Sequence, residues 1–203
     1  MNADSPNRLI FTLDFDELVA QLRELEGGPT PDEFLTAIAR VGRNNGPALA
    51  YDYVFPGNDS QYFLDNSGIE QARERAKHIA PVLHHVWSSA EYPEGHLKHE
   101  AWAFLFETAG YRVDGVPATP PQQLTLYRGT TPQRLEAMAW TADRAMAQRF
   151  ATGGLRGRPQ GHVWQVQVTG DQLVAHIADG EEDEYLLHPE EVISVAEHAV
   201  RLL

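Results

Sequence analysis

The chain contains no cysteine among its 203 residues. This absence excludes disulfide scaffolds, thiolate zinc sites, iron–sulfur clusters and cysteine nucleophiles. Positive charge is also scarce, because 16 Lys and Arg residues stand against 29 Asp and Glu residues and give a formal net charge of −13. Since the affinity of proteins for nucleic-acid phosphates comes from clustered basic residues, the composition argues against a general polyanion binder.

Long apolar runs are missing as well. The N-terminal residues show no apolar stretch behind a basic start, so we expect no signal peptide, and the longest apolar runs fall far short of a bilayer span. These absences predict a cytoplasmic protein with no membrane partner. The length fits one domain, and 42% hydrophobic residues suffice for a core without disulfides.

The first half of the chain is typical of helices. Apolar residues recur at helical spacing over four ranges, and Pro81 should interrupt or kink the third. These ranges are 14–25, 30–41, 69–87 and 96–109. The aromatic-rich range 48–64, broken by Pro56-Gly57, predicts a loop with a short strand. We therefore expect a helical N-terminal lobe over residues 1–114, with Trp87 and Trp102 in its core.

The pattern then changes to short strands. Residues 115–123 hold three prolines and no periodic pattern, which indicates a Pro-rich connector. After it, short runs of strand-forming residues surround one helix, 143–151, that begins at an aspartate cap. The expected strands are 124–128, 163–169, 173–177 and 185–187. The sequence predicts an α+β fold in which 124–203 form a strand-rich catalytic core, with lobe, connector and core in one compact domain.

Three segments of the strand-rich part carry candidate chemistry. The strand 124–129 ends in Arg128-Gly129, where a guanidinium can fork onto phosphate oxygens and a glycine lets a ligand approach the backbone. The segment 139–143 leads Trp140 and Thr141 into a helix. Taken alone, the first segment is also typical of a surface arginine and the second of a capped junction with its tryptophan in the core.

The third segment is strongly acidic. Four acidic residues, 181–184, run directly into the apolar strand Tyr185-Leu186-Leu187, and residues 171–191 hold eight acids with no Lys or Arg. Most such runs are solvated loops, but Glu184 abuts the strand and should be held at its edge. If the strand begins by Glu182, then Glu182 and Glu184 project from one face. Paired carboxylates can divide charge stabilisation and proton transfer between them.

In this order and spacing, the three segments resemble the ADP-ribosyltransferases of the arginine–serine–glutamate group, which carry a Glu-x-Glu loop. The matching pieces are LYRG at 126–129, WTADRAMAQRFA at 140–151 and EDEYLLHP at 182–189. The resemblance covers about residues 124–203. It implies a mixed, mostly antiparallel split β core with a helical N-terminal lobe. It also implies a mono-ADP-ribosyltransferase that moves ADP-ribose from NAD to arginine of a partner protein, without a metal.

The resemblance also implies roles for individual residues. Arg128 would hold the NAD phosphates, and Thr141 would position Glu184 by a hydrogen bond. Glu184 would be the catalytic glutamate at the nicotinamide ribose, and Glu182 would orient and deprotonate the acceptor guanidinium. The residues expected to contact NAD are Arg128, Gly129, Trp140, Thr141, Arg156 and Arg158. Where the family has Ser-Thr-Ser, this chain has Trp140-Thr141-Ala142, which leaves a single hydroxyl.

Other interpretations stay open. The same segments fit ADP-ribosylation of nucleic acid, NAD hydrolysis, or a non-catalytic module that binds NAD or a protein. The range 128–158 contains six arginines, so nucleic acid stays an alternative acceptor, although a less favoured one. The histidines His84-His85, His96 and His99 lack the usual spacing of a metal site, so we interpret them as partly exposed helix residues. The helical lobe either completes the NAD cleft, which we favour, or binds a separate partner.

Overall fold

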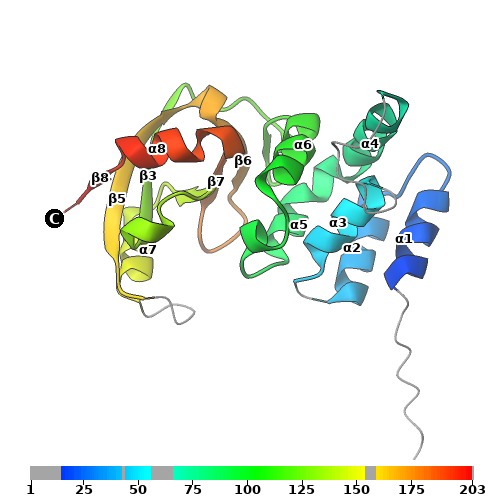
Figure 1. The fold of residues 1–203 in the computed structure, drawn as a ribbon, viewed down its shortest axis with the longest axis horizontal. Helices are drawn as coiled ribbons and strands as arrows, with labels where there is room; N and C mark the ends of the chain where they lie inside the picture. The colour runs from blue at the N-terminus through cyan, green and yellow to red at the C-terminus, as the bar shows by residue number, and fades with distance from the viewer. Residues whose placement is uncertain (1–14, 43, 56–65, 154–158, 203) are drawn as a thin grey trace, which may run out of the picture.

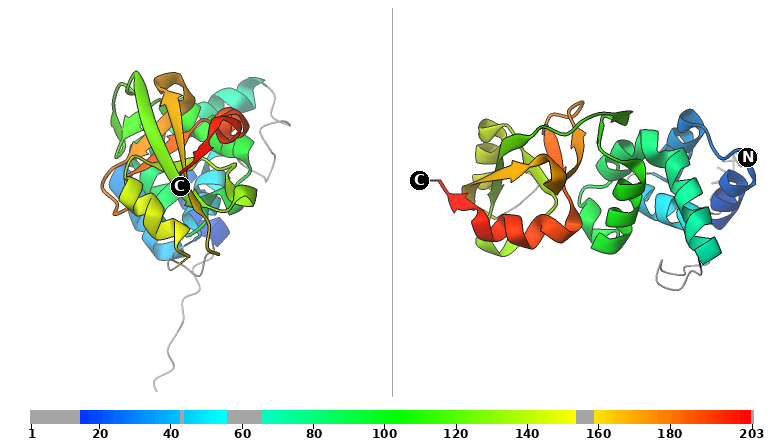
Figure 2. Two further views of the ribbon diagram at one scale, coloured as in Figure 1. Left: turned by 90° about the vertical axis from the view of Figure 1, so that its left-hand side faces the viewer. Right: turned by 90° about the horizontal axis from the view of Figure 1, so that it is seen from above.

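The computed structural model describes residues 15–42, 44–55, 66–153 and 159–202. The helices α1–α6 gather at one end of an elongated molecule, and the strands lie at the other end (Figures 1 and 2). The helical half consists of α1 (Phe15–Glu24), α2 (Pro31–Val41), α3 (Gly46–Val54), α4 (Asn66–Ile79), α5 (Leu83–Ser88) and α6 (His99–Ala109). The short 3₁₀ turns Ala80–Val82 and Pro93–Gly95 precede α5 and α6.

Local chemistry explains two of these helix boundaries. A reciprocal capping box starts α2, in which the Thr30 hydroxyl accepts from Glu33 N and the Glu33 carboxylate accepts from Thr30 N. Pro81 lies where α4 ends and α5 has not yet begun, as its missing N–H predicts. The break at Pro81 confirms the expectation from sequence.

The prediction for residues 48–64 is wrong where the structure describes them. Residues 46–54 form the helix α3, which begins at Gly46-Pro47, and five of its apolar residues are buried. The segment is apolar on nearly every side and therefore lacks the one-sided pattern by which an amphipathic helix is recognised. Residues 56–65, the rest of the predicted loop, lie outside the described residues.

The strand half forms one mixed, mostly antiparallel sheet. In the part of the chain that the structure describes, the sheet has eight strands in the order β2-β1-β6-β7-β4-β3-β5-β8, and the β1–β6 pair is parallel. The strands are β1 (Arg112–Val113), β2 (Val116–Pro117), β3 (Gln123–Thr130), β4 (Ala139–Thr141), β5 (His162–Thr169), β6 (Leu173–Ile177), β7 (Glu184–Leu187) and β8 (Val200–Arg201). The structure confirms the mixed helix-and-strand class. The resemblance implied a split β core, whereas the backbone ladder joins the eight described strands in a single sheet.

The first strands fall where the sequence indicated helical lobe and connector. β1 and β2 form a hairpin whose two-residue turn, Asp114-Gly115, has φ values of 46° and 78°. Positive φ at both turn residues is the geometry of the type I′ turn, for which Asp-Gly is a preferred sequence. The hairpin joins the sheet because β1 pairs with β6.

Two further helices belong to the strand half. α7 (Arg144–Ala151) starts at the Asp143 cap, whose carboxylate accepts from Ala145 N, and packs on β3 and β5. A Cβ atom at Gly129 would lie 1.8 Å from the Ala147 carbonyl oxygen, so only glycine permits this contact. α8 (Val192–His198), which the sequence did not predict, contributes Val192 and Val195 to the core.

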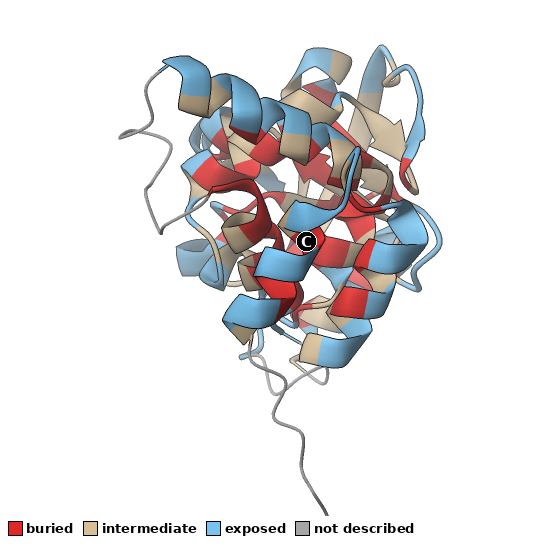
Figure 3. Ribbon diagram, turned by 90° about the vertical axis from the view of Figure 1, so that its right-hand side faces the viewer, coloured by how far each residue is buried: buried red, intermediate tan, exposed pale blue. Residues whose placement is uncertain are grey.

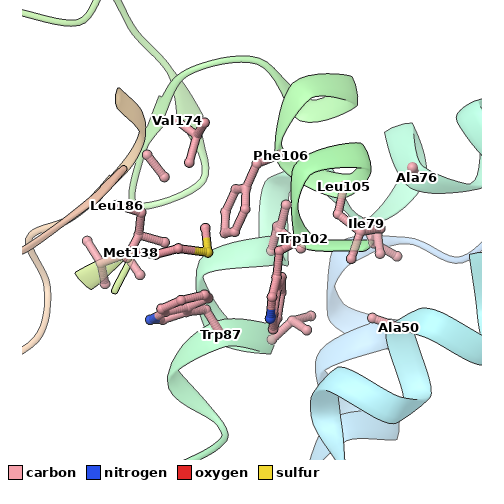
Figure 4. Packing of buried hydrophobic residues seen from close by; sticks show 14 of the residues in the cluster. Ala50, Ala76, Ile79, Trp87, Trp102, Leu105, Phe106, Met138, Val174 and Leu186 are labelled. Atoms are coloured by element: carbon pink, nitrogen blue, oxygen red, sulfur yellow. The ribbon is translucent and has the colours of Figure 1, made fainter. Parts of the chain in front are cut away.

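One hydrophobic core runs through both halves (Figure 3). The Trp87 and Trp102 rings lie 5.0 Å apart, and Trp102 stacks on Phe106 at 5.7 Å. Met138 and Leu186 of the strand half face these aromatic rings (Figure 4). The two halves are therefore held together by shared apolar burial, which is the dominant favourable term in folding. None of the helices in the described residues is long and apolar enough to cross a membrane.

Candidate active site

A cleft of about 980 Å³ opens between the two halves. Its wall from the helical half spans residues 87–95, and the opposite walls come from the end of β3, from α7 and from the acidic segment Gly180–Glu184. Six of the residues expected in the site line it: Arg128, Gly129, Trp140, Thr141, Glu182 and Glu184. The other two, Arg156 and Arg158, lie outside the described residues.

A row of paired residues crosses the sheet at the cleft. Tyr127 on β3 is registered with Thr141 on β4, and Thr141 is registered with Glu184 on β7. Directly opposed residues in an antiparallel pair have neighbouring side chains on one face. The ladder therefore brings Thr141 and Glu184 side by side, as the sequence segments suggested.

Glu182 and Glu184 form a hydrogen-bonded pair of carboxyl groups. Burial, and to a smaller extent the adjacent charge of Glu182, raise the pKa of Glu184 to about 7 against the opposing effects of Trp87 and Arg128. Because two neighbouring carboxylates in a shielded site resist double ionisation, Glu184 is only partly ionised near neutral pH. A carboxyl group poised near neutrality can change its protonation during a reaction.

The pair does not arise from a common strand face. β7 begins at Glu184, and Asp183 just before it has a φ of 46°, in the left-handed region. The strand therefore does not begin by Glu182, which was the condition for both carboxylates to project from one strand face, because the chain turns sharply at Asp183. This turn brings the Glu182 carboxyl back to the carboxyl of Glu184.

The hydrogen bond that holds Glu184 comes from the helical half. Trp87 Nε1 donates to Glu184 Oε2 at 3.3 Å. The Thr141 hydroxyl, which was expected to hold Glu184, accepts from Asp143 N at 3.0 Å and so supports the entry to α7. The sequence pattern correctly indicated that Trp87 is buried. It carried no signal for the partner of the indole N–H, since that partner lies 97 residues away.

Arg128 is fixed by backbone oxygens. Its guanidinium donates to the carbonyl oxygens of Ala139 and Arg134. Its positive charge acts on Glu184, where it lowers the pKa, and on Glu94. A guanidinium held beside a cleft carboxylate is suited to bind an anionic group and to balance the charge of that carboxylate.

Glu94 is a cleft residue that the sequence did not reveal. Its carboxylate accepts from Met138 N at 2.6 Å and lies 3.7 Å from His99 Nε2. Burial favours its neutral form, but the contacts with His99, Met138 N and Arg128 outweigh burial and hold its pKa below the ordinary value. Glu94 thus links the helical half to the segment that precedes β4.

Trp140 is part of the core as well as of the cleft wall. Only 2% of its surface is exposed, and its indole N–H donates to the Ala137 carbonyl oxygen at 3.0 Å. Its polar atom is therefore already satisfied within the protein.

The acidic segment is anchored at both ends. Near its start, Asp114 Oδ1 accepts from Ala178 N at 2.7 Å and from Asp179 N at 3.1 Å. Near its end, the Asp183 carboxylate lies 2.7 Å from His176 Nε2, and the His176 ring stacks on Tyr185. These contacts give the segment a defined path, in contrast to a solvated acidic loop.

Comparison with protein-family models, with curated proteins and with solved structures found no match for this chain.

Proposed function

We propose that the protein is a mono-ADP-ribosyltransferase that uses NAD as donor and arginine of a partner protein as acceptor. The hydrogen-bonded pair Glu182–Glu184, beside the Arg128 guanidinium in the cleft, carries this proposal. The cleft volume of about 980 Å³ lies at the upper end of the range of small-molecule sites, as a dinucleotide requires.

The donor half of the reaction needs a carboxylate at the ribose. Breaking the nicotinamide–ribose bond builds positive charge on the sugar, as in glycoside hydrolysis, and a fixed carboxylate stabilises that charge. Glu184 fits this role because the strand ladder and the Trp87 hydrogen bond hold it. Arg128 would bind the pyrophosphate, and nicotinamide would leave as a neutral molecule with the electron pair of the broken bond.

The acceptor half needs a base. A guanidinium nitrogen that bonds to the ribose carbon must lose one proton, and the product again carries one positive charge. Glu182 would take this proton, since it lies beside Glu184 in the acidic segment. The negative charge of Glu182 also favours a cationic acceptor.

Labelled NAD provides the direct test. Wild-type protein, Glu184→Gln and the matched control Glu181→Gln would each be incubated with NAD, with and without a cell extract. Glu181 is exposed and lies in the same acidic segment, so its amide variant changes the charge without changing the carboxyl pair. We expect wild type and Glu181→Gln to label extract proteins, and Glu184→Gln to lose at least a hundredfold in rate.

The acceptor follows from the same experiment. Competition of the label by free arginine analogues supports an arginine acceptor, and label on nucleic acid contradicts it. Nicotinamide release with no labelled macromolecule would identify an NAD glycohydrolase. NAD binding by calorimetry with no turnover would identify a binding module. Labelling that survives Glu184→Gln would overturn the assignment of Glu184.

A further inference from the structure

Two adjacent histidines of α5 meet the start of the acidic segment. One ligand atom each of His84, His85 and Asp179 lie within 4.8 Å of one another. The two imidazole rings lie 4.0 Å apart at an angle of 39°. The sequence had grouped these histidines with His96 and His99 along the chain, whereas the fold pairs them with Asp179, ninety-five positions further on.

The side chain of His84 is unusually buried for a polar residue. Only 9% of its surface is exposed, and its Nδ1 atom is buried without a hydrogen-bond partner in the described residues. The Asp114-Gly115 turn packs against the ring so closely that a Cβ atom at Gly115 would lie 2.9 Å from Nδ1. A buried polar side chain without a partner is costly, so the arrangement calls for a function or a ligand.

Asp179 is held in place toward the histidines. The Asp114 carboxylate accepts from Asp179 N and from the preceding N–H, and these bonds fix the backbone that carries the Asp179 side chain.

We propose that His84, His85 and Asp179 form a binding site for a divalent transition-metal ion of the zinc class. Two imidazoles and one carboxylate are a common donor set for Zn²⁺, with water completing a tetrahedron. Ligand atoms around a tetrahedral Zn²⁺ are about 3.3 Å apart, given bonds of about 2.0–2.1 Å. Small side-chain rotations of the exposed Asp179 and the half-buried His85 would close the present spacing.

The position of the site gives the ion a structural role. α5 also carries Trp87, whose indole holds Glu184, and Asp179 lies five residues before Glu184 in the chain. A metal that joins α5 to Asp179 would therefore fix both sides of the carboxyl pair relative to each other. The ion would bind outside the reacting centre, so metal binding can be measured whether or not the protein is a transferase.

The test is metal binding by the full chain after treatment with a chelator. Isothermal titration with Zn²⁺ and visible absorption with Co²⁺ would compare wild type with His85→Ala and Asp179→Asn. The matched control is His96→Ala, because His96 is an exposed histidine outside the group. We expect one equivalent of Zn²⁺ in wild type and in the control, with at least tenfold weaker binding in both site variants. We also expect tetrahedral Co²⁺ bands that the site variants lose.

The alternative to a metal ion at this site is a buried water molecule. A small cavity of about 10 Å³ beside His84, lined also by Gly115 and His176, has room for one water molecule. If water alone satisfies His84, Zn²⁺ will not bind, or will bind with equal affinity in all four proteins. Either result would overturn the proposal. Circular dichroism and thermal melts without metal would show that each variant is folded before its titration is interpreted.

Discussion

The helical and strand halves contribute different kinds of groups to the cleft. The strand half supplies Arg128, Glu182 and Glu184, the charged groups that the sequence segments singled out. The helical half supplies the Trp87 indole and the Glu94 carboxylate, which bond to groups of the strand half. The charged groups that the motifs singled out therefore lie in the strand half, whereas the side chains that hydrogen-bond to that half come from the helical half. The three predictions below test this division.

Removal of the helical half should have the largest effect. A chain that begins at Gly115 loses Trp87, Trp102 and Phe106, and leaves Met138 and Leu186 of the strand half exposed to water. It also loses β1, the neighbour of β6. We expect this truncated chain to be insoluble or inactive, as judged by soluble yield and circular dichroism. A stable truncated protein that turns over NAD would show that the strand half is sufficient alone.

Replacement of Trp87 should distinguish its effect on the pKa of Glu184 from its contribution to core packing. Trp87→Phe keeps an aromatic ring but removes the donor to Glu184, so the pKa of Glu184 should rise by about one unit. The matched variant is Trp102→Phe, because Trp102 is equally buried and donates to the Pro93 carbonyl oxygen. It should lower stability without moving this pKa.

Carbon NMR of labelled glutamate would follow the titration in both variants, with Glu184→Gln to assign the signal. If the two variants shift the pKa equally, the indole N–H of Trp87 has no special effect on Glu184. A rise in Trp87→Phe alone would also move the midpoint of the kcat/KM profile for NAD turnover to higher pH.

The smallest expected effect is a gain in the stability of the variant Glu184→Gln, relative to wild type, at high pH. The pKa of Glu184 is about 7 in the fold against an ordinary 4.5, so the folded state disfavours its ionised form. The resulting loss of stability is complete above pH 7, shrinks as the pH falls through 7, and vanishes below about 4.5. Glu184→Gln should therefore raise Tm at pH 8 by about 2–4 °C or more, and by less at pH 5.

Thermal melts of Glu184→Gln and of the exposed control Glu181→Gln at both pH values would measure this. The control should leave Tm nearly unchanged at each pH, since Glu181 is exposed. A Tm for Glu184→Gln below that of wild type at pH 8 would mean that the ionised carboxylate stabilises the fold, contrary to the direction of its pKa.

Local patterns in the sequence were sufficient for much of the fold. Helix caps such as Thr30 and Asp143, and the break at Pro81, depend on neighbours within a few residues. The helix at 46–54 was missed because its apolar residues surround the axis. The β1–β2 hairpin was missed although Asp114-Gly115 is a strong turn signal, because its strands are only two residues each and the prolines that follow dominate the segment.

From the sequence, the site was predictable only in the residues that the strand half contributes. Short motifs indicated that Arg128, Thr141, Glu182 and Glu184 belong together, and all four line the cleft. Trp87 and Glu94 had no such signal, because their partners are distant in sequence and the types of residue involved are common in cores and turns. The turn at Asp183 was equally hidden, since a positive φ at an aspartate follows from the surrounding contacts and not from the residue alone.

The start of β7 at Glu184 also separates a fixed carboxylate from an adjustable one. Glu184 is paired on one side with Thr141 and on the other with Ile177, so its backbone cannot shift without opening two ladders. Glu182 lies outside the ladder, beyond the turn at Asp183. Under the proposed function, the geometry toward the donor would stay constant while the geometry toward the acceptor could adapt. One such scaffold could serve acceptors of different shape, and substitutions in the acidic segment could retarget it without a change in how NAD is cleaved.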